Sequence, residues 1–141
     1  MAVYLLDTNA LSALMNEEPR AVGRAAAIGP TDRVVTNTVA RGEILYGLGR
    51  VPHGRRRREL EAKARNVFHR IPCEGLPQAV ADQYARIKLE SQQAGTPLDE
   101  NDLWIAAAAM ERGAVLVTSD TDFQRVSGLR TEDWTLCIPR A

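Results

Sequence analysis

The stretch Asp99–Asp122, DENDLWIAAAAMERGAVLVTSDTD, predicts a helix followed by a buried strand, with carboxylates at the outer ends of both. Asp99 occupies the N-cap position, and acids fill the first turn, where the helix dipole favours them. An apolar stripe follows, and a glycine ends the helix. The short run Ala114–Val117 is apolar and β-branched, as in a strand covered on both faces. Asp102 opens the helix and Asp120 follows the strand, so both can lie at the sheet edge where open parallel sheets bind ligands.

Length and composition indicate one ordinary globular domain, spanning residues 1–141. The formal net charge is zero, so any attraction to nucleic acid has to come from a local patch. The sequence has no apolar run long enough to span a membrane and no secretory signal, which favours a cytoplasmic protein. Cys73 and Cys137 lie in short apolar runs, and we expect both to be buried, free thiols.

Apolar strand patterns alternate with helix patterns along the whole chain. The expected strands are Val3–Leu6, Arg33–Thr36, Arg70–Cys73, Ala114–Val117 and Thr135–Ile138. Between them we expect helices after Thr8, from Pro19 to about Ala27, from Val39, from Arg55 to about His69, from Pro77 to Gln93 and from Glu100. This order predicts an α/β fold, with a central, mostly parallel sheet of four or five strands flanked by helices.

Acids recur where these predicted elements end or face inward: Asp7, Glu43, Asp102 and Asp120. A single aspartate usually caps a helix, and Asp102 alone would be explained in that way. Asp7 is different, because it directly follows an apolar strand and so stands at the ligand-binding edge of the sheet.

Several converging carboxylates would need a cation. Two unit charges roughly 4 Å apart repel by about 4 kcal/mol at an effective dielectric constant near 20. Mg²⁺ prefers oxygen ligands and retains bound water, and Mn²⁺ suits the same ligands. Such a site is suited to phosphodiester hydrolysis by water, without a nucleophilic side chain.

Four segments resemble, in order and over nearly the whole chain, the motifs of PIN-domain ribonucleases. The closest resemblance is to the VapC and FitB-like toxins of prokaryotic toxin–antitoxin modules. The segments are Val3–Asn9 (VYLLDTN), Arg41–Gly47 (RGEILYG), Asn101–Ala107 (NDLWIAA) and Val117–Phe123 (VTSDTDF).

The resemblance implies a single PIN domain acting as a Mg²⁺- or Mn²⁺-dependent endoribonuclease toxin. Its catalytic and metal-binding acids would be Asp7, Glu43, Asp102 and Asp120. Hydrogen bonds from Thr8, Asn9 and Thr118 would support them. The implied partners are an RNA substrate, a VapB-like antitoxin that occludes the active site, and a second copy of the chain in a homodimer.

The fourth acid is ambiguous. Many relatives have asparagine at the position of Asp120 and an acid further along the chain, so Asp122 is an alternative. We favour Asp120, because it is nearer to the end of the strand, and Asp122 would then support the site or cap the following turn.

From Arg50 to Arg70, basic side chains outnumber the two acids Glu59 and Glu61. The segment includes the run Arg55, Arg56, Arg57 and Arg58. They could form a solvated helix face with pairs such as Arg55–Glu59 and Arg57–Glu61. They could also contact RNA phosphates beside the acidic site, or bind the antitoxin.

Two other functions are considered. A phosphoacceptor receiver domain also has an acidic sheet edge, but it would need an acceptor aspartate after a middle strand and a lysine late in the chain. Here the middle strand leads to Asn37 and the last lysine is Lys88. A non-catalytic PIN-fold RNA-binding module would be expected to lack one or more acids, and none is missing.

Overall fold

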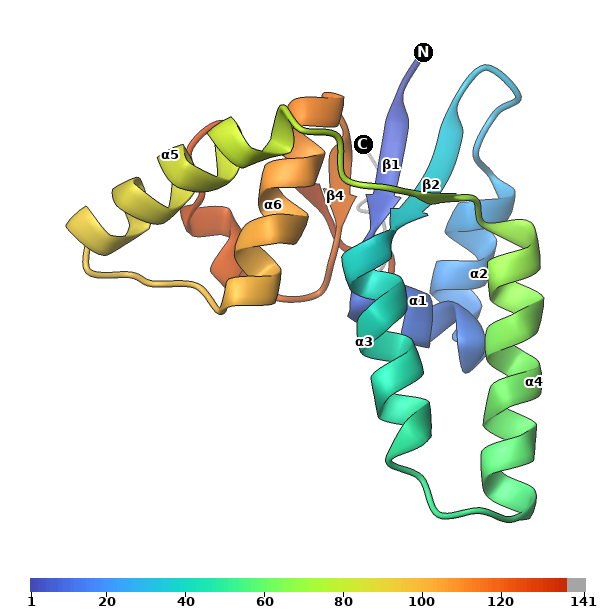
Figure 1. The fold of residues 1–141 in the computed structure, drawn as a ribbon. Helices are drawn as coiled ribbons and strands as arrows, with labels where there is room; N and C mark the ends of the chain where they lie inside the picture. The colour runs from blue at the N-terminus through green and yellow to red at the C-terminus, as the bar shows by residue number, and fades with distance from the viewer. Residues whose placement is uncertain (137–141) are drawn as a thin grey trace.

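The computed structural model describes residues 1–136 and has a five-stranded sheet at its centre (Figure 1). Its strands lie in the order β3-β2-β1-β4-β5, and every neighbouring pair is parallel. The strands are β1 (Val3–Leu6), β2 (Arg33–Asn37), β3 (Cys73–Glu74), β4 (Val115–Val117) and β5 (Thr131–Glu132). The predicted fold class, with a parallel sheet of four or five strands, is confirmed.

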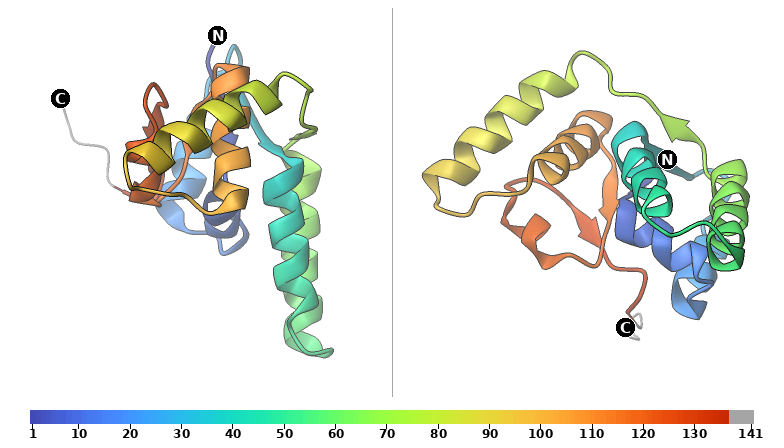
Figure 2. Two further views of the ribbon diagram at one scale, coloured as in Figure 1. Left: turned by 60° about the vertical axis from the view of Figure 1, so that its left-hand side comes forward. Right: turned by 60° about the horizontal axis from the view of Figure 1, so that its bottom comes forward.

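Helices flank this sheet, and two of them extend well beyond it. The helices are α1 (Thr8–Met15), α2 (Pro19–Ala26), α3 (Thr38–Gly49), α4 (Arg55–Arg70), α5 (Val80–Gln93), α6 (Glu100–Arg112) and the 3₁₀ helix η1 (Thr121–Arg125). Helices α3 and α4 run side by side as an antiparallel pair that projects past the ends of the strands (Figures 1 and 2). Helix α5 packs along α6 on the other side of the molecule. Among residues 1–136, no helix is long and apolar enough to cross a membrane.

The segment Asp99–Asp122 forms the predicted helix and strand at the centre of the fold. Helix α6 buries Leu103, Ile105 and the alanines Ala106–Ala109, whose small side chains let the helix approach the sheet closely. Gly113 ends the helix with φ +67°, a left-handed conformation that favours glycine. Asp99 is the N-cap residue as predicted, although its side chain makes no capping hydrogen bond.

The strand predicted at Thr135–Ile138 is wrong for Thr135 and Leu136, the two of its residues that the structure describes. The last strand is Thr131–Glu132, beside β4, and Thr135 lies in a turn. Asp133 fixes that turn, because its carboxylate accepts hydrogen bonds from the Thr135 amide at 2.8 Å and hydroxyl at 2.6 Å. Leu136, an apolar residue of the predicted strand, is exposed. Residues 137 and 138 lie outside the described residues.

Three further expectations need correction. Cys73 is exposed, because β3 is a two-residue strand at the edge of the sheet and not a covered one; Cys137 lies outside the described residues. The helix expected from Pro77 begins at Val80, after a turn in which the Val80 amide donates to the Pro77 carbonyl at 3.0 Å. The predicted strand Arg70–Cys73 is wrong in its bounds, because Arg70 still belongs to α4 and the edge strand is Cys73–Glu74.

Candidate active site

All four predicted acids lie at the carboxyl edge of the sheet or on helices that reach it. Asp7 follows β1 and caps α1, while Asp120 follows β4 and caps η1. Asp102 lies in the first turn of α6, and Glu43 lies along α3. Because β1 and β4 are adjacent and parallel, their ends bring Asp7 and Asp120 to the same edge. In Figure 1 this edge lies where α1, α3 and the start of α6 come together.

Asp7 is buried, with only 3% of its surface exposed. Its Oδ1 accepts a hydrogen bond from the Ala10 amide at 2.9 Å. The pKa of Asp7 is raised from 3.8 to about 6. Burial is the largest cause and the negative charge of Asp120 adds to it, while hydrogen bonds involving Thr118 and nearby amides oppose the change. An ionised Asp7 is therefore costly in the absence of a cation.

Asp102 is half-buried, and its pKa is also raised to about 6. Burial is the largest cause, followed by the negative charges of Asp120, Glu43, Asp99 and Asp7. The structure therefore places Asp7, Glu43 and Asp120 close enough to Asp102 for their negative charges to raise its pKa. Asp99 adds a fifth charge that sequence reasoning treated only as a helix cap. Its position one helical turn before Asp102 could have signalled this contribution.

The residues that follow β1 make polar contacts with α3 and with the residues that follow β4. The Thr8 hydroxyl donates to Glu43 Oε1 at 2.9 Å. The Asn9 amide group spans both strands, because its Nδ2 donates to Thr118 Oγ1 at 3.4 Å and its Oδ1 accepts from the Ser119 amide at 3.0 Å. Thr118 Oγ1 also accepts from the Asp120 amide at 3.0 Å. Thr8, Asn9 and Thr118 thus lie where the supporting residues were expected.

The surroundings of the two candidate fourth acids differ. Asp120 contributes negative charge at both Asp7 and Asp102, and its Oδ1 accepts from the Asp122 amide at 2.9 Å. Asp122 Oδ1 instead lies 3.2 Å from the guanidinium of Arg125, which neutralises it. This arrangement favours Asp120.

The donor set fits a hard divalent cation. Within residues 1–136, no three His, Cys, Asp or Glu side chains already form a compact ligand group. The carboxylates of Asp7, Glu43 and Asp120 instead accept the local hydrogen bonds described above. The candidate site nevertheless offers only oxygen donors, which Mg²⁺ and Mn²⁺ prefer. A bound cation would favour the ionised form of Asp7 and Asp102, the two carboxylates whose pKa is raised.

The basic segment forms the N-terminal part of α4, at the far end of the α3–α4 pair. The two predicted ion pairs are present, Arg55–Glu59 at 2.9 Å and Arg57–Glu61 at 2.8 Å. Arg56 and Arg58 are exposed. The run of arginines is therefore in part a salt-bridged helix face.

Comparison with known proteins agrees with this fold. Residues 4–129 match the PIN domain family. Ribonuclease VapC1 of Haemophilus influenzae (strain R2866) is 31% identical, over 94% of this chain and 98% of the relative. The tRNA(fMet)-specific endonuclease VapC of Shigella flexneri is 29% identical, over 96% and 100%.

A solved structure, VapBC-1 from nontypeable Haemophilus influenzae, superposes with a TM-score of 0.84 and 27% identity, covering 95% of this chain and 99% of the other. The five-stranded parallel sheet with acids at its carboxyl edge is thus that of a PIN domain. This chain belongs to the PIN-domain family and, within it, to the VapC ribonucleases.

Proposed function

We propose that this chain is a divalent-metal-dependent endoribonuclease, with Mg²⁺ or Mn²⁺ as cofactor, and the toxin of a VapBC-type toxin–antitoxin module in the cytoplasm. The observation that carries this proposal is the shared electrostatic environment of Asp7, Glu43, Asp102 and Asp120, which raises the pKa of two of them to about 6. The similarity to VapC ribonucleases supports RNA as the substrate.

Asp7, Asp102 and Asp120 would hold the cation, and Glu43 would either join them or orient the attacking water. When bound, the cation would stabilise negative charge on the scissile phosphate and make water more acidic. The Thr8 hydroxyl donates to Glu43 Oε1 and so orients that carboxylate. The other oxygen, Oε2, is then our candidate to accept a proton from the attacking water.

Cleavage of total cellular RNA by the purified chain tests this function. We expect discrete cuts in the presence of Mg²⁺, and none from Asp102→Asn, in which one oxygen ligand loses its charge. Mapping the cut sites by sequencing would also identify the target RNA. Full cleavage by a correctly folded Asp102→Asn protein would contradict the assigned site.

The arginines at the start of α4 give a second test. Because Arg55 and Arg57 are paired with glutamates, we propose that the exposed Arg56 and Arg58 contact RNA phosphates. In an Asp102→Asn background, which avoids cutting, Arg56→Gln/Arg58→Gln should weaken RNA binding. Each lost contact should reduce the slope of log affinity against log salt by roughly 0.7.

The matched control for this experiment is Arg55→Gln, which removes an arginine already neutralised by Glu59. Fluorescence anisotropy with labelled RNA at several salt concentrations measures both slopes. An equal loss for each removed charge in the control and in the double variant would assign the effect to net charge alone.

We also propose a VapB-like antitoxin as a partner, supported by the match to the VapBC-1 structure, and a second copy of the chain in a homodimer. A small antitoxin gene directly upstream would support the module. The receiver-domain alternative is not favoured by the PIN domain match. A non-catalytic RNA-binding module is not favoured either, because every acid of the pattern is present.

A further inference from the structure

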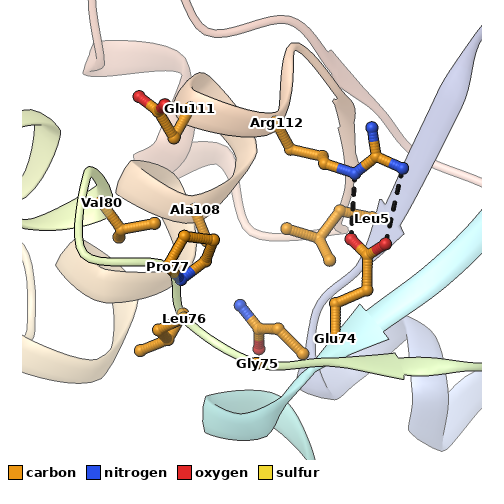
Figure 3. Close-up of a pocket in the computed structure, with 10 residues that line it drawn as sticks. Leu5, Glu74, Gly75, Leu76, Pro77, Val80, Ala108, Glu111 and Arg112 are labelled. Carbon is orange, nitrogen blue, oxygen red and sulfur yellow. Dashed lines mark hydrogen bonds and ion pairs between the residues drawn. The ribbon is translucent and has the colours of Figure 1, made fainter.

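A cavity of about 630 Å³ lies between the linker that follows β3 and the C-terminal half of α6. Figure 3 shows Leu5, Leu76, Pro77, Val80 and Ala108 around it. These side chains make most of its wall apolar. Its volume is within the range of sites that bind small organic molecules, which is roughly 300–1,000 Å³.

One buried polar group in this wall has no partner. Asn37 lines the cavity and is 2% exposed. Its Oδ1 accepts from the Ala40 amide at 3.0 Å and caps α3, which fixes the orientation of the side-chain amide. Its Nδ2 has no hydrogen-bond partner within residues 1–136. Because buried donors in folded proteins are normally paired, a ligand in the cavity could supply the acceptor that residues 1–136 do not.

The charges at the cavity restrict the ligand further. Glu74 accepts two hydrogen bonds from Arg112, at 3.1 and 3.4 Å, and this ion pair forms one side of the cavity (Figure 3). Glu111 adds a carboxylate, so the three charged side chains sum to one negative charge. A phosphate or carboxylate is therefore disfavoured inside. A pure hydrocarbon is disfavoured too, because it would leave Asn37 Nδ2 unpaired.

One residue that lines the cavity, Asn37, lies beside a proposed metal ligand in the sheet. Strands β1 and β2 pair with Leu5 opposite Val35, and continuing this register by two residues places Asn37 level with Asp7. Both residues follow their strands at the carboxyl edge of the sheet. A group bound at Asn37 would therefore lie one strand away from the acid that we propose as a metal ligand.

We propose that this cavity binds a nucleobase, with Asn37 Nδ2 donating to a carbonyl oxygen or ring nitrogen of the base. A base is planar, neutral and largely apolar on its faces, and it carries acceptors at its edge. Proteins that read single-stranded RNA bind splayed-out bases in this manner. The base could belong to the RNA substrate, which rests on the proposed function, or to a free nucleoside, which does not.

The test is titration of the ¹⁵N-labelled protein with adenosine, guanosine, cytidine and uridine, followed by NMR. At least one nucleoside should give saturable shifts at the Asn37 side-chain amide and at the backbone amides of Val80 and Ala108. Asn37→Ser keeps an oxygen that can cap α3 but removes Nδ2, so affinity should fall about tenfold.

A second variant keeps the test decisive if Asn37→Ser disturbs the fold. Ala108→Leu fills the cavity and should abolish binding, whereas Ala81→Leu, on the exposed side of α5, should bind like the unaltered protein. The proposal is overturned if no nucleoside gives saturable shifts, so that the cavity holds water only. It is also overturned if Ala108→Leu binds as tightly as Ala81→Leu.

RNA cleavage then distinguishes the two sources of the base. A changed base preference next to the cut in Asn37→Ser would assign the cavity to the substrate. An unchanged preference, with nucleoside binding retained in the unaltered protein, would assign it to a free nucleoside. Absence of any RNA cleavage would reject the proposed function and leave the result of the nucleoside titration standing.

Discussion

Asp7→Asn should abolish RNA cleavage and, at the same time, make the metal-free protein more stable. Catalysis should fall by more than about a hundredfold, because even the loss of a residue that supports a metal ligand typically costs 10–100-fold. Stability should rise because asparagine is neutral and can still cap α1 through its side-chain oxygen, as Asp7 does for the Ala10 amide.

The stability gain should depend on pH in a defined direction. The pKa of Asp7 is about 6 in the folded protein and 3.8 ordinarily, so the folded state binds the proton more tightly. The wild-type protein therefore loses stability relative to Asp7→Asn as the pH rises from about 4 to 6. Above pH 7 the loss reaches roughly 3 kcal/mol, and below pH 4 the two proteins should be nearly equal.

Thermal unfolding in a chelator at several pH values measures this difference, which should reach roughly 5–10 °C at neutral pH. Asp122→Asn is the matched control, because Asp122 is half-exposed and paired with Arg125. It should cleave RNA and unfold much like the wild type. An inactive Asp7→Asn protein that is also less stable at every pH would instead indicate a structural role for Asp7.

Divalent metal should act on both stability and activity. A cation that binds only the folded protein stabilises it by about 2.7 kcal/mol at a concentration one hundred times its dissociation constant. Mg²⁺ or Mn²⁺ should therefore raise the melting temperature of the wild type by roughly 5–10 °C. Removing the metal with EDTA should stop RNA cleavage, and adding it back should restore cleavage.

The same measurement on Asp102→Asn separates specific binding from a general salt effect. Asp102 experiences the charges of the other acids, so its loss should remove most of the stabilisation by metal. An equal rise in melting temperature in the wild type and Asp102→Asn, or full cleavage in excess EDTA, would contradict the proposed cofactor.

Much of the fold follows from local patterns that tertiary contacts reinforce. Strand β1 could be predicted because it is apolar throughout, and α6 because acids precede its apolar stripe and Gly113 ends it. The last strand could not, because Thr131–Glu132 is polar and is recruited to the sheet only by its pairing with β4. The exposure of Cys73 likewise depends on how few residues β3 contributes.

The candidate site was likewise only partly predictable from local sequence patterns. The positions of Asp7 and Asp120 after apolar strands were sufficient to predict that they would meet at one edge. The preference for Asp120 over Asp122 came from its place near the end of the strand, and the structure adds an ion pair between Asp122 and Arg125 that the sequence did not predict. The cavity beside Asn37 could not be predicted, because its wall combines Leu5, the linker after β3 and the end of α6, which are far apart in the sequence.

The order of the strands has a consequence for synthesis of the protein. Strand β1 is made first but lies at the centre of the sheet, between β2 and β4. Its β4 neighbour is Val115–Val117, so more than a hundred residues separate the two. Asp120 is made later still. A ribosome-bound chain that ends before β4 therefore has Asp7 without one of the two strands that flank β1, and any nuclease activity of this site has to wait until Asp120 has also been made.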